Sequence, residues 1–241
     1  MNTLNTVTQV APTSARAAGP RHDVYGPIHK GLRSFMFDTL ARLGRADANA
    51  ATSFSGAIGQ TRALLGKLQE HLNHENLFLH PALEARSSGS AAATALEHAD
   101  HEQAFAELER LLSSVERAFA DGGGPNIESL AKQLYLSLSF FVAENLAHMY
   151  REETETTELL WRHYSDDELR RIVGEIVASE TPEGRALGLR WMLPSLTPQE
   201  RLGLLAGARQ GLPSSAFQGL MQLAEGVLEP AEYRQLVNAL G

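Results

Sequence analysis

Apolar residues recur at alternating spacings of four and three along long stretches of this chain. That spacing places the apolar side chains on one face of an α-helix. The alternation of β-branched and polar residues that is typical of strands is almost absent. The pattern therefore predicts an all-α protein with long helices over about 23–43, 52–80, 91–120 and 126–163.

Short links separate the predicted helices. They include RSSGS at 86–90 and DGGGP at 121–125, and three glycines followed by a proline favour a loop. Long helices joined by short loops pack as antiparallel neighbours. We therefore expect an up-down-up-down four-helix bundle over residues 22–164, preceded by a flexible tail at 1–21.

Residues 165–241 predict a helical C-terminal extension. Ser165 with Glu168, and Thr197 with Glu200, have the spacing of a capping box. Short helices are expected near 166–178, 182–193, 198–209, 213–228 and 230–240. The extension contains no histidine or cysteine, so we expect no chemistry there. Its apolar content predicts packing against the bundle or, in a homo-oligomer, against a second subunit. The apolar residues for that packing include Trp191, Met192, Leu193, Phe217, Leu220 and Met221.

Two predicted helices carry ionisable residues on their apolar faces. The inward stripes end with His71, Glu75 and Phe78 in the second helix and with His148, Glu152 and Leu159 in the fourth. Residues four apart lie one turn apart on the same face of a helix. Each of these helices therefore turns a His-x-x-x-Glu pair toward the core, whereas Glu153 is expected to point away from it.

The other two long helices add further imidazoles. His29 lies on the inward stripe of the first helix, one turn after Tyr25. His98 and His101 both lie on the inward stripe of the third. Tyr25 is expected to pack in the core with its hydroxyl near these groups.

Three neighbouring residues have weaker assignments. His74 is expected at the edge of the site, and His80 at the rim of the bundle because Pro81 should end the helix. Glu144 precedes His148 by one turn. It is interpreted either as part of a solvated face or as a hydrogen-bond partner of an imidazole.

Buried carboxylates and imidazoles need compensation. An unpaired carboxylate in a dry core costs several kcal/mol, and a bound metal ion removes that cost. The chain contains no cysteine, so nitrogen and oxygen must supply the ligands, and imidazole with carboxylate suits iron, manganese, zinc or copper. Two His-x-x-x-Glu pairs with single histidines from the other helices provide enough ligands for two such ions.

The sequence resembles the haemerythrin-like (HHE cation-binding) proteins over about residues 23–165. The resemblance rests on IHKGLR, HLNHENLFLHPAL, EHADHEQAFAEL and HMYREE, one motif in each long helix. It implies a non-haem di-iron centre with two iron ions. The ligands that it implies are His29, His71, Glu75, His101, His148 and Glu152. His98, His74, Tyr25 and Glu144 are further candidates, as additional ligands or as hydrogen-bond partners of ligands.

The third helix leaves two alternatives open. The segment HEQAFAEL that begins at His101 fits the usual continuation of the family better than the segment that begins at His98. We therefore prefer His101 as the ligand and expect His98 to be a seventh ligand or a neighbouring donor. An additional ligand would fill a position at which oxygen or nitric oxide could bind.

Several functions fit such a centre. The resemblance implies binding or sensing of oxygen, or reaction with nitric oxide or peroxide, with an electron donor that the sequence does not identify. The alternatives are a di-iron oxidase, which would make the protein an enzyme, iron storage or sensing, and iron–sulfur cluster repair. A carrier needs a dry, narrow pocket, whereas an oxidase needs room for its substrate and a proton donor.

Composition excludes other classes of partner. The 241-residue chain is 43% hydrophobic with a formal net charge of −8, which is too acidic for nucleic acid to be a natural partner. It contains no apolar run of the length that a membrane span needs. The N-terminal sequence lacks the basic start and apolar core of a signal peptide, so a cytoplasmic location is expected.

Overall fold

The computed structural model describes residues 21–48, 50–122 and 126–241. The predicted tail at 1–21 therefore lies outside the described residues except for Arg21. Within the described part, helices dominate and no strand is present. The all-α class is confirmed.

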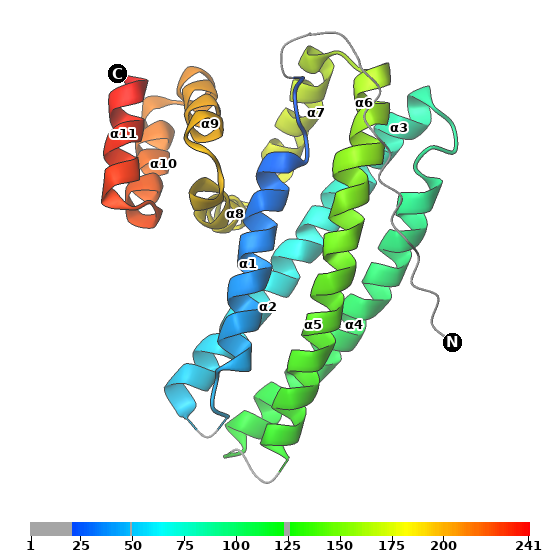
Figure 1. Cartoon of the computed structure of the whole chain (residues 1–241), viewed down its shortest axis with the longest axis vertical. Coiled ribbons are helices and arrows are strands. Elements are labelled where there is room, and N and C mark those ends of the chain that lie inside the picture. The colour runs from blue at the N-terminus through cyan, green and yellow to red at the C-terminus, as the bar shows by residue number, and fades with distance from the viewer. Residues whose placement is uncertain (1–20, 49, 123–125) are drawn as a thin grey trace.

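The long helices lie side by side, and successive ones run in opposite directions (Figure 1). Helix α1 packs against α2 and α5, and α4 packs against the same two helices. The bounds are α1 Gly26–Gly44, α2 Ala51–His74, α4 Ala92–Ala120 and α5 Ile127–Arg151. Two of them continue beyond a π turn: α2 through η1 (Glu75–Leu79) into α3 (His80–Arg86), and α5 through η2 (Glu152–Thr156) into α6 (Thr157–His163).

Apolar side chains fill the bundle along most of its length. They include Phe54, Leu64, Leu112, Leu134 and Leu138, each with 0% of its surface exposed. The predicted stripe of the third helix is buried from Thr94 to Val115. Buried histidines and glutamates gather near the ends of α2 and α5, which places the polar site within a scaffold of dispersion contacts.

The π turns shift the buried face by one residue. Leu79 is buried where the uninterrupted pattern predicted Phe78, and Leu160 is buried where it predicted Leu159. A π turn closes i to i+5 hydrogen bonds and so inserts one residue into the helix. The hydroxyl of Thr157, the first residue after η2, also donates to the Glu152 carbonyl oxygen, at 2.8 Å.

The prediction that Pro81 ends the second helix is wrong. Helix α3 runs from His80 to Arg86 with Pro81 in its first turn. Proline costs most in a helix interior, where its ring meets the carbonyl of residue i−4. The wider turn immediately before Pro81 relieves this conflict, so the helix continues.

The C-terminal part is helical, as expected. Its elements are α7 Asp166–Ser179, α8 Pro182–Ser195, α9 Pro198–Gly211, α10 Ser214–Val227 and α11 Pro230–Leu240. Both predicted capping boxes are present, at Ser165 with Glu168 and at Thr197 with Glu200. Figure 1 shows α9, α10 and α11 grouped beside α8, away from the long helices.

Helix α8 is the main contact between this part and the bundle. Trp191 stacks on Phe35 of α1 with ring centroids 4.4 Å apart. Gly31 approaches the α8 backbone so closely that a Cβ atom there would lie 2.8 Å from Cα of Met192. Leu193, by contrast, belongs to a separate core with residues of α9, α10 and α11, which Leu220 and Met221 also join.

The close approach at Gly31 gives a prediction with a matched control. Gly31→Ala should destabilise the protein, because the added methyl group forces α8 away from α1. Gly66→Ala, in the interior of α2 with nothing within 4 Å of a Cβ there, should stabilise it by about 0.5–1 kcal/mol through helix propensity. Thermal unfolding of both variants should shift in opposite directions, and a stabilised Gly31→Ala protein would contradict the contact.

Candidate metal centre

The ionisable residues of all the long helices meet near the two π turns. Glu75 and Glu152 are the first residues of η1 and η2, and Glu152 has 0% of its surface exposed. The possible metal-ligating groups contain His29, His71, Glu75, His98, His148 and Glu152. Apart from half-buried His71, each of these residues is buried.

One group of candidate ligand atoms lies between α1 and α2. It consists of His29, His71 and Glu75. The Nε2 atoms of His29 and His71 are 3.0 Å apart, and Nε2 of His71 lies 3.1 Å from Oε1 of Glu75. Oε2 of Glu152 is 3.5 Å from Nε2 of His29.

A second group lies between α4 and α5. It consists of Glu75, His98, His148 and Glu152. The Nε2 atoms of His98 and His148 are 3.1 Å apart. His98 Nε2 lies 3.4 Å from Oε2 of Glu75, and His148 Nε2 lies 3.3 Å from Oε1 of Glu152.

Both carboxylates therefore lie between the two pairs of histidines. Glu75 directs Oε1 toward His71 and Oε2 toward His98. Glu152 directs Oε2 toward His29 and Oε1 toward His148. This is the arrangement that two carboxylates need in order to bridge two cations.

The donor atoms fit a metal better than they fit one another. Both oxygens of Glu152 and Oε1 of Glu75 are buried without a hydrogen-bond partner. Burying such oxygens without compensation costs several kcal/mol. Imidazole nitrogens and carboxylate oxygens converging on common points match the preferences of first-row metal ions such as iron.

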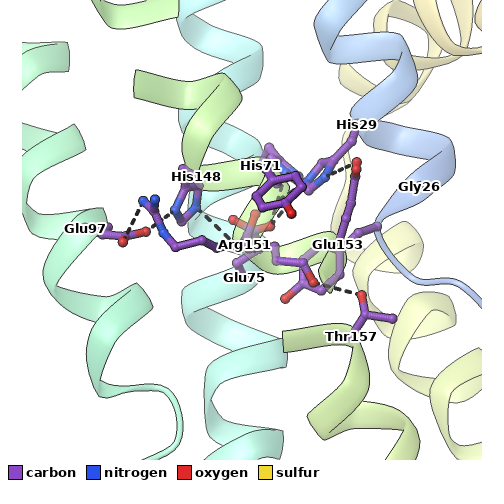
Figure 2. A network of polar contacts seen from close by, with 12 residues as sticks. Gly26, His29, His71, Glu75, Glu97, His148, Arg151, Glu153 and Thr157 are labelled. Atoms are coloured by element: carbon purple, nitrogen blue, oxygen red, sulfur yellow. Dashed lines mark hydrogen bonds and ion pairs between the residues drawn. The ribbon is translucent and has the colours of Figure 1, made fainter. Parts of the chain in front are cut away.

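Acidic residues outside the cluster hydrogen-bond to the Nδ1 atoms of two of the imidazoles (Figure 2). Nδ1 of His29 lies 3.0 Å from Oε1 of Glu153, which also pairs with Arg33. Nδ1 of His148 lies 2.7 Å from Oε2 of Glu97. Such partners accept the Nδ1 proton and direct Nε2 of the ring inward, as in metal sites where a carboxylate orients a histidine ligand.

Sequence reasoning missed these outer partners. Glu97 lies on α4 but holds a histidine of α5, and Glu153 lies in η2 but holds a histidine of α1. Asn76 belongs to the same class, since its Oδ1 lies 2.7 Å from Nδ1 of His98. No spacing within one helix indicates a partner on another, and the expectation that Glu153 points away from the site is wrong.

The imidazole pKa values reflect this environment. Burial opposes a charge on His29, but its hydrogen bond to Glu153 and the neighbouring carboxylates raise its pKa to about 9. Burial likewise opposes a charge on His148, whose pKa Glu152 and Glu97 raise to about 9. Burial lowers the pKa of His98 to about 3. In the metal-free protein, protons thus occupy sites that a cation would take, and metal binding would release them.

The remaining third-helix histidine lies beside the cluster. His101 is buried, with its ring edge-on to that of His148 at a centroid distance of 4.9 Å. It belongs to neither group of converging atoms. Its pKa is lowered to about 4, mainly by burial and to a smaller extent by the charge of His148.

Tyr25 lies next to His29 with ring centroids 5.2 Å apart. Its hydroxyl is buried and has no hydrogen-bond partner. Burial raises the pKa of this hydroxyl well above its ordinary value, and the charges of Glu152 and Glu75 add to the effect. The expectation of a buried ring with its hydroxyl near the site agrees with this position.

The other candidates lie at greater distance. His74 is half-buried beside Phe78 and outside both groups. Glu144 is exposed on α5, so of its two interpretations the solvated face agrees with the structure. His80 is not at the rim: it is 7% exposed, and its ring stacks on that of His98 at 4.6 Å. The continuation of the helix through Pro81 carries it inward.

A small cavity adjoins the cluster. Its volume is about 10 Å³, which is near the room that one water molecule needs. The polar walls come from the site, and the apolar walls enclose it on the side of the bundle core. The lining residues are Leu68, His71, Leu72, Glu75, His101, Phe105, Asn145, His148 and Met149.

The comparisons with known proteins identify the class. The family model of the hemerythrin HHE cation binding domain matches residues 27–171. The chain belongs to this family. No curated protein and no solved structure matches the chain. The domain and its cluster of histidines and glutamates indicate a metal-binding protein.

The helices also bear on membrane association. None within the described residues combines the length and the apolar character needed to cross a membrane.

The outer carboxylates lead to a prediction about metal retention. Glu153→Gln should lower iron affinity by about 10–100-fold, because the ring of His29 loses the charge that holds its Nδ1 proton. Glu155→Gln changes an exposed residue in the same π turn and serves as the control. Iron content after dialysis against a chelator measures the difference, and equal retention in the two variants would contradict the role of Glu153.

Proposed function

We propose that the chain holds two iron ions bridged by Glu75 and Glu152 and that this centre binds oxygen or a related small molecule. The observation that carries the proposal is the position of the two carboxylates, each with one oxygen toward either pair of histidines. A single ion would need only one of these groups.

The geometry favours a particular set of ligands. His29 and His71 would hold one ion, and His98 and His148 would hold the other. This set differs from the one that the sequence favoured, since His98 takes the place of His101. The short distances from Nε2 of His98 to Oε2 of Glu75 and to Nε2 of His148 support this change of ligand.

His101 then has a different role. It lines the cavity together with Asn145 and the apolar residues Phe105 and Met149. With its pKa lowered to about 4 by burial and by His148, the ring is neutral near pH 7. It could orient a small ligand without adding a charge to the site.

The size of the cavity distinguishes the candidate functions. Bound iron in its reduced form would supply an open coordination position and electrons for a diatomic molecule. Leu68, Leu72 and Phe105 line a space of about 10 Å³, which is too small for an organic substrate. This supports binding or sensing of oxygen or nitric oxide over oxidation of a larger substrate.

A reaction that consumes peroxide or nitric oxide is the second candidate. It is favoured by Tyr25, whose buried hydroxyl has no hydrogen-bond partner and could donate a proton beside His29. Exposing the reduced protein to oxygen distinguishes the two candidate functions. A stable adduct in the optical spectrum supports binding, whereas turnover of added peroxide or nitric oxide supports an enzyme. Iron storage and iron–sulfur cluster repair remain alternative predictions. A cytoplasmic location and the need for an electron donor also remain predictions.

The bridging arrangement predicts two iron ions per chain. Glu75→Gln and Glu152→Gln should each lower the iron content, because each removes charge from both positions at once. They should also lower the temperature of unfolding of the iron-loaded protein, since bound metal stabilises the folded state by mass action. Elemental analysis with Mössbauer spectroscopy measures this, and a reproducible value of one or none after reconstitution would refute the dinuclear centre.

The ligand on α4 can be tested directly. His98→Ala should lose iron, because it removes a nitrogen that faces both Glu75 and His148. His101→Ala should retain both ions but change the optical spectrum of the azide complex, because it alters the wall of the cavity. Retention of two ions by His98→Ala together with iron loss in His101→Ala would restore the assignment that the sequence favoured.

A further inference from the structure

An apolar stripe runs along the outer face of α5, away from the bundle core. Its residues recur at spacings of four and three, which places them within about 40° of a single line along the helix. Leu136, Phe140 and Tyr150 have 55%, 67% and 59% of their surfaces exposed. The stripe consists of Leu136, Phe140, Ala143, Ala147 and Tyr150, and all of these residues are exposed.

Exposed apolar residues at this spacing form the seam by which two helices pair. We propose that the stripe pairs two copies of this chain, with their α5 helices antiparallel about a two-fold axis at Ala143. The proposal is independent of the metal centre, and it places the interface on α5 rather than on the C-terminal helices.

The order of large and small residues supports an antiparallel pair. With Ala143 facing its own copy, Phe140 falls between Ala143 and Ala147 of the second copy, and Leu136 faces Tyr150. Phe140 thus meets small side chains near the axis, as close packing requires, and Leu136 packs against Tyr150 at each end of the seam. A parallel pair would set Phe140 against Phe140 and Ala147 against Ala147, leaving a clash at one level and a gap at the other.

The charges at the ends of the stripe are complementary in the same arrangement. Lys132 is exposed at one end, and Glu155 is exposed in η2 at the other. The π turn rotates Glu155 back toward the stripe. An antiparallel pair brings Lys132 of each copy to Glu155 of the other, whereas a parallel pair would set like charges together.

The surface beside the stripe has room for the second copy. A groove of about 580 Å³ lies between α4 and α5, with Leu111, Leu136 and Phe140 among its lining residues. Tyr150 of the second copy would enter it at the level of Leu136. The stripe covers about 21 Å along the helix at 1.5 Å per residue, which is short for a standard interface of roughly 800 Å² per partner. The dimer should therefore be weak and dependent on concentration.

Sedimentation velocity over a range of protein concentrations tests the surface. The unmodified chain should dimerise as concentration rises, and Phe140→Asp should weaken the association at least about tenfold. Phe37→Asp, at an exposed phenylalanine on α1, is the control and should leave the association unchanged. A chain that is monomeric at every concentration, or a dimer insensitive to Phe140→Asp, would overturn the proposal.

The orientation has its own tests. Lys132→Glu should weaken the dimer, and adding Glu155→Lys to it should restore association by reversing both members of each ion pair. Because the chain has no cysteine, Ala143→Cys should give a disulfide-linked dimer on mild oxidation, since it lies on the axis. Leu136→Cys should not, because the two copies of residue 136 lie at opposite ends of the seam. Equal cross-linking of both variants, or failure of the charge reversal to restore association, would refute the antiparallel pair.

Discussion

The burial of two carboxylates at the centre of the bundle is the constraint on which the rest of the site depends. Glu75 and Glu152 are almost inaccessible, and together they bring two negative charges into a region of low dielectric. Neither can compensate the other, and burial together with the charge of Glu75 raises the pKa of Glu152. Positive charge must therefore come from the surrounding imidazoles or from metal ions. The convergence of histidines from all of the long helices follows from this requirement.

The π turns also help to accommodate the two buried glutamates. Each begins at one of the buried glutamates, and each shifts the following apolar residues by one position, so that Leu79 and Leu160 are buried. In a regular helix the residues three and four positions after each glutamate would share a face with its carboxylate. The inserted residue separates the metal-binding face from the apolar packing that follows it, which is consistent with the frequent occurrence of π turns at functional sites.

The sequence predicted the helices, the inward stripes and the glutamates well, because each depends on periodicity within one helix. It failed where the outcome depends on contacts between helices. The hydrogen bonds of Glu97 and Glu153 to histidines on other helices leave no local pattern. The choice between His98 and His101 also depends on contacts between helices, because both are inward by periodicity and it is Nε2 of His98 that faces Glu75.

Helix α1 connects the centre to the C-terminal helices, which lie mostly beyond the matched family domain. One side of α1 presents His29 to the carboxylates, and the other receives α8, where Gly31 allows backbone contact and Phe35 stacks on Trp191. Lys30 pairs with Glu200 of α9 at 2.6 Å. Because these contacts flank His29 in sequence, they restrict the movement of the segment that positions it. The extension thus contributes to the geometry of the centre although it supplies none of the proposed ligands.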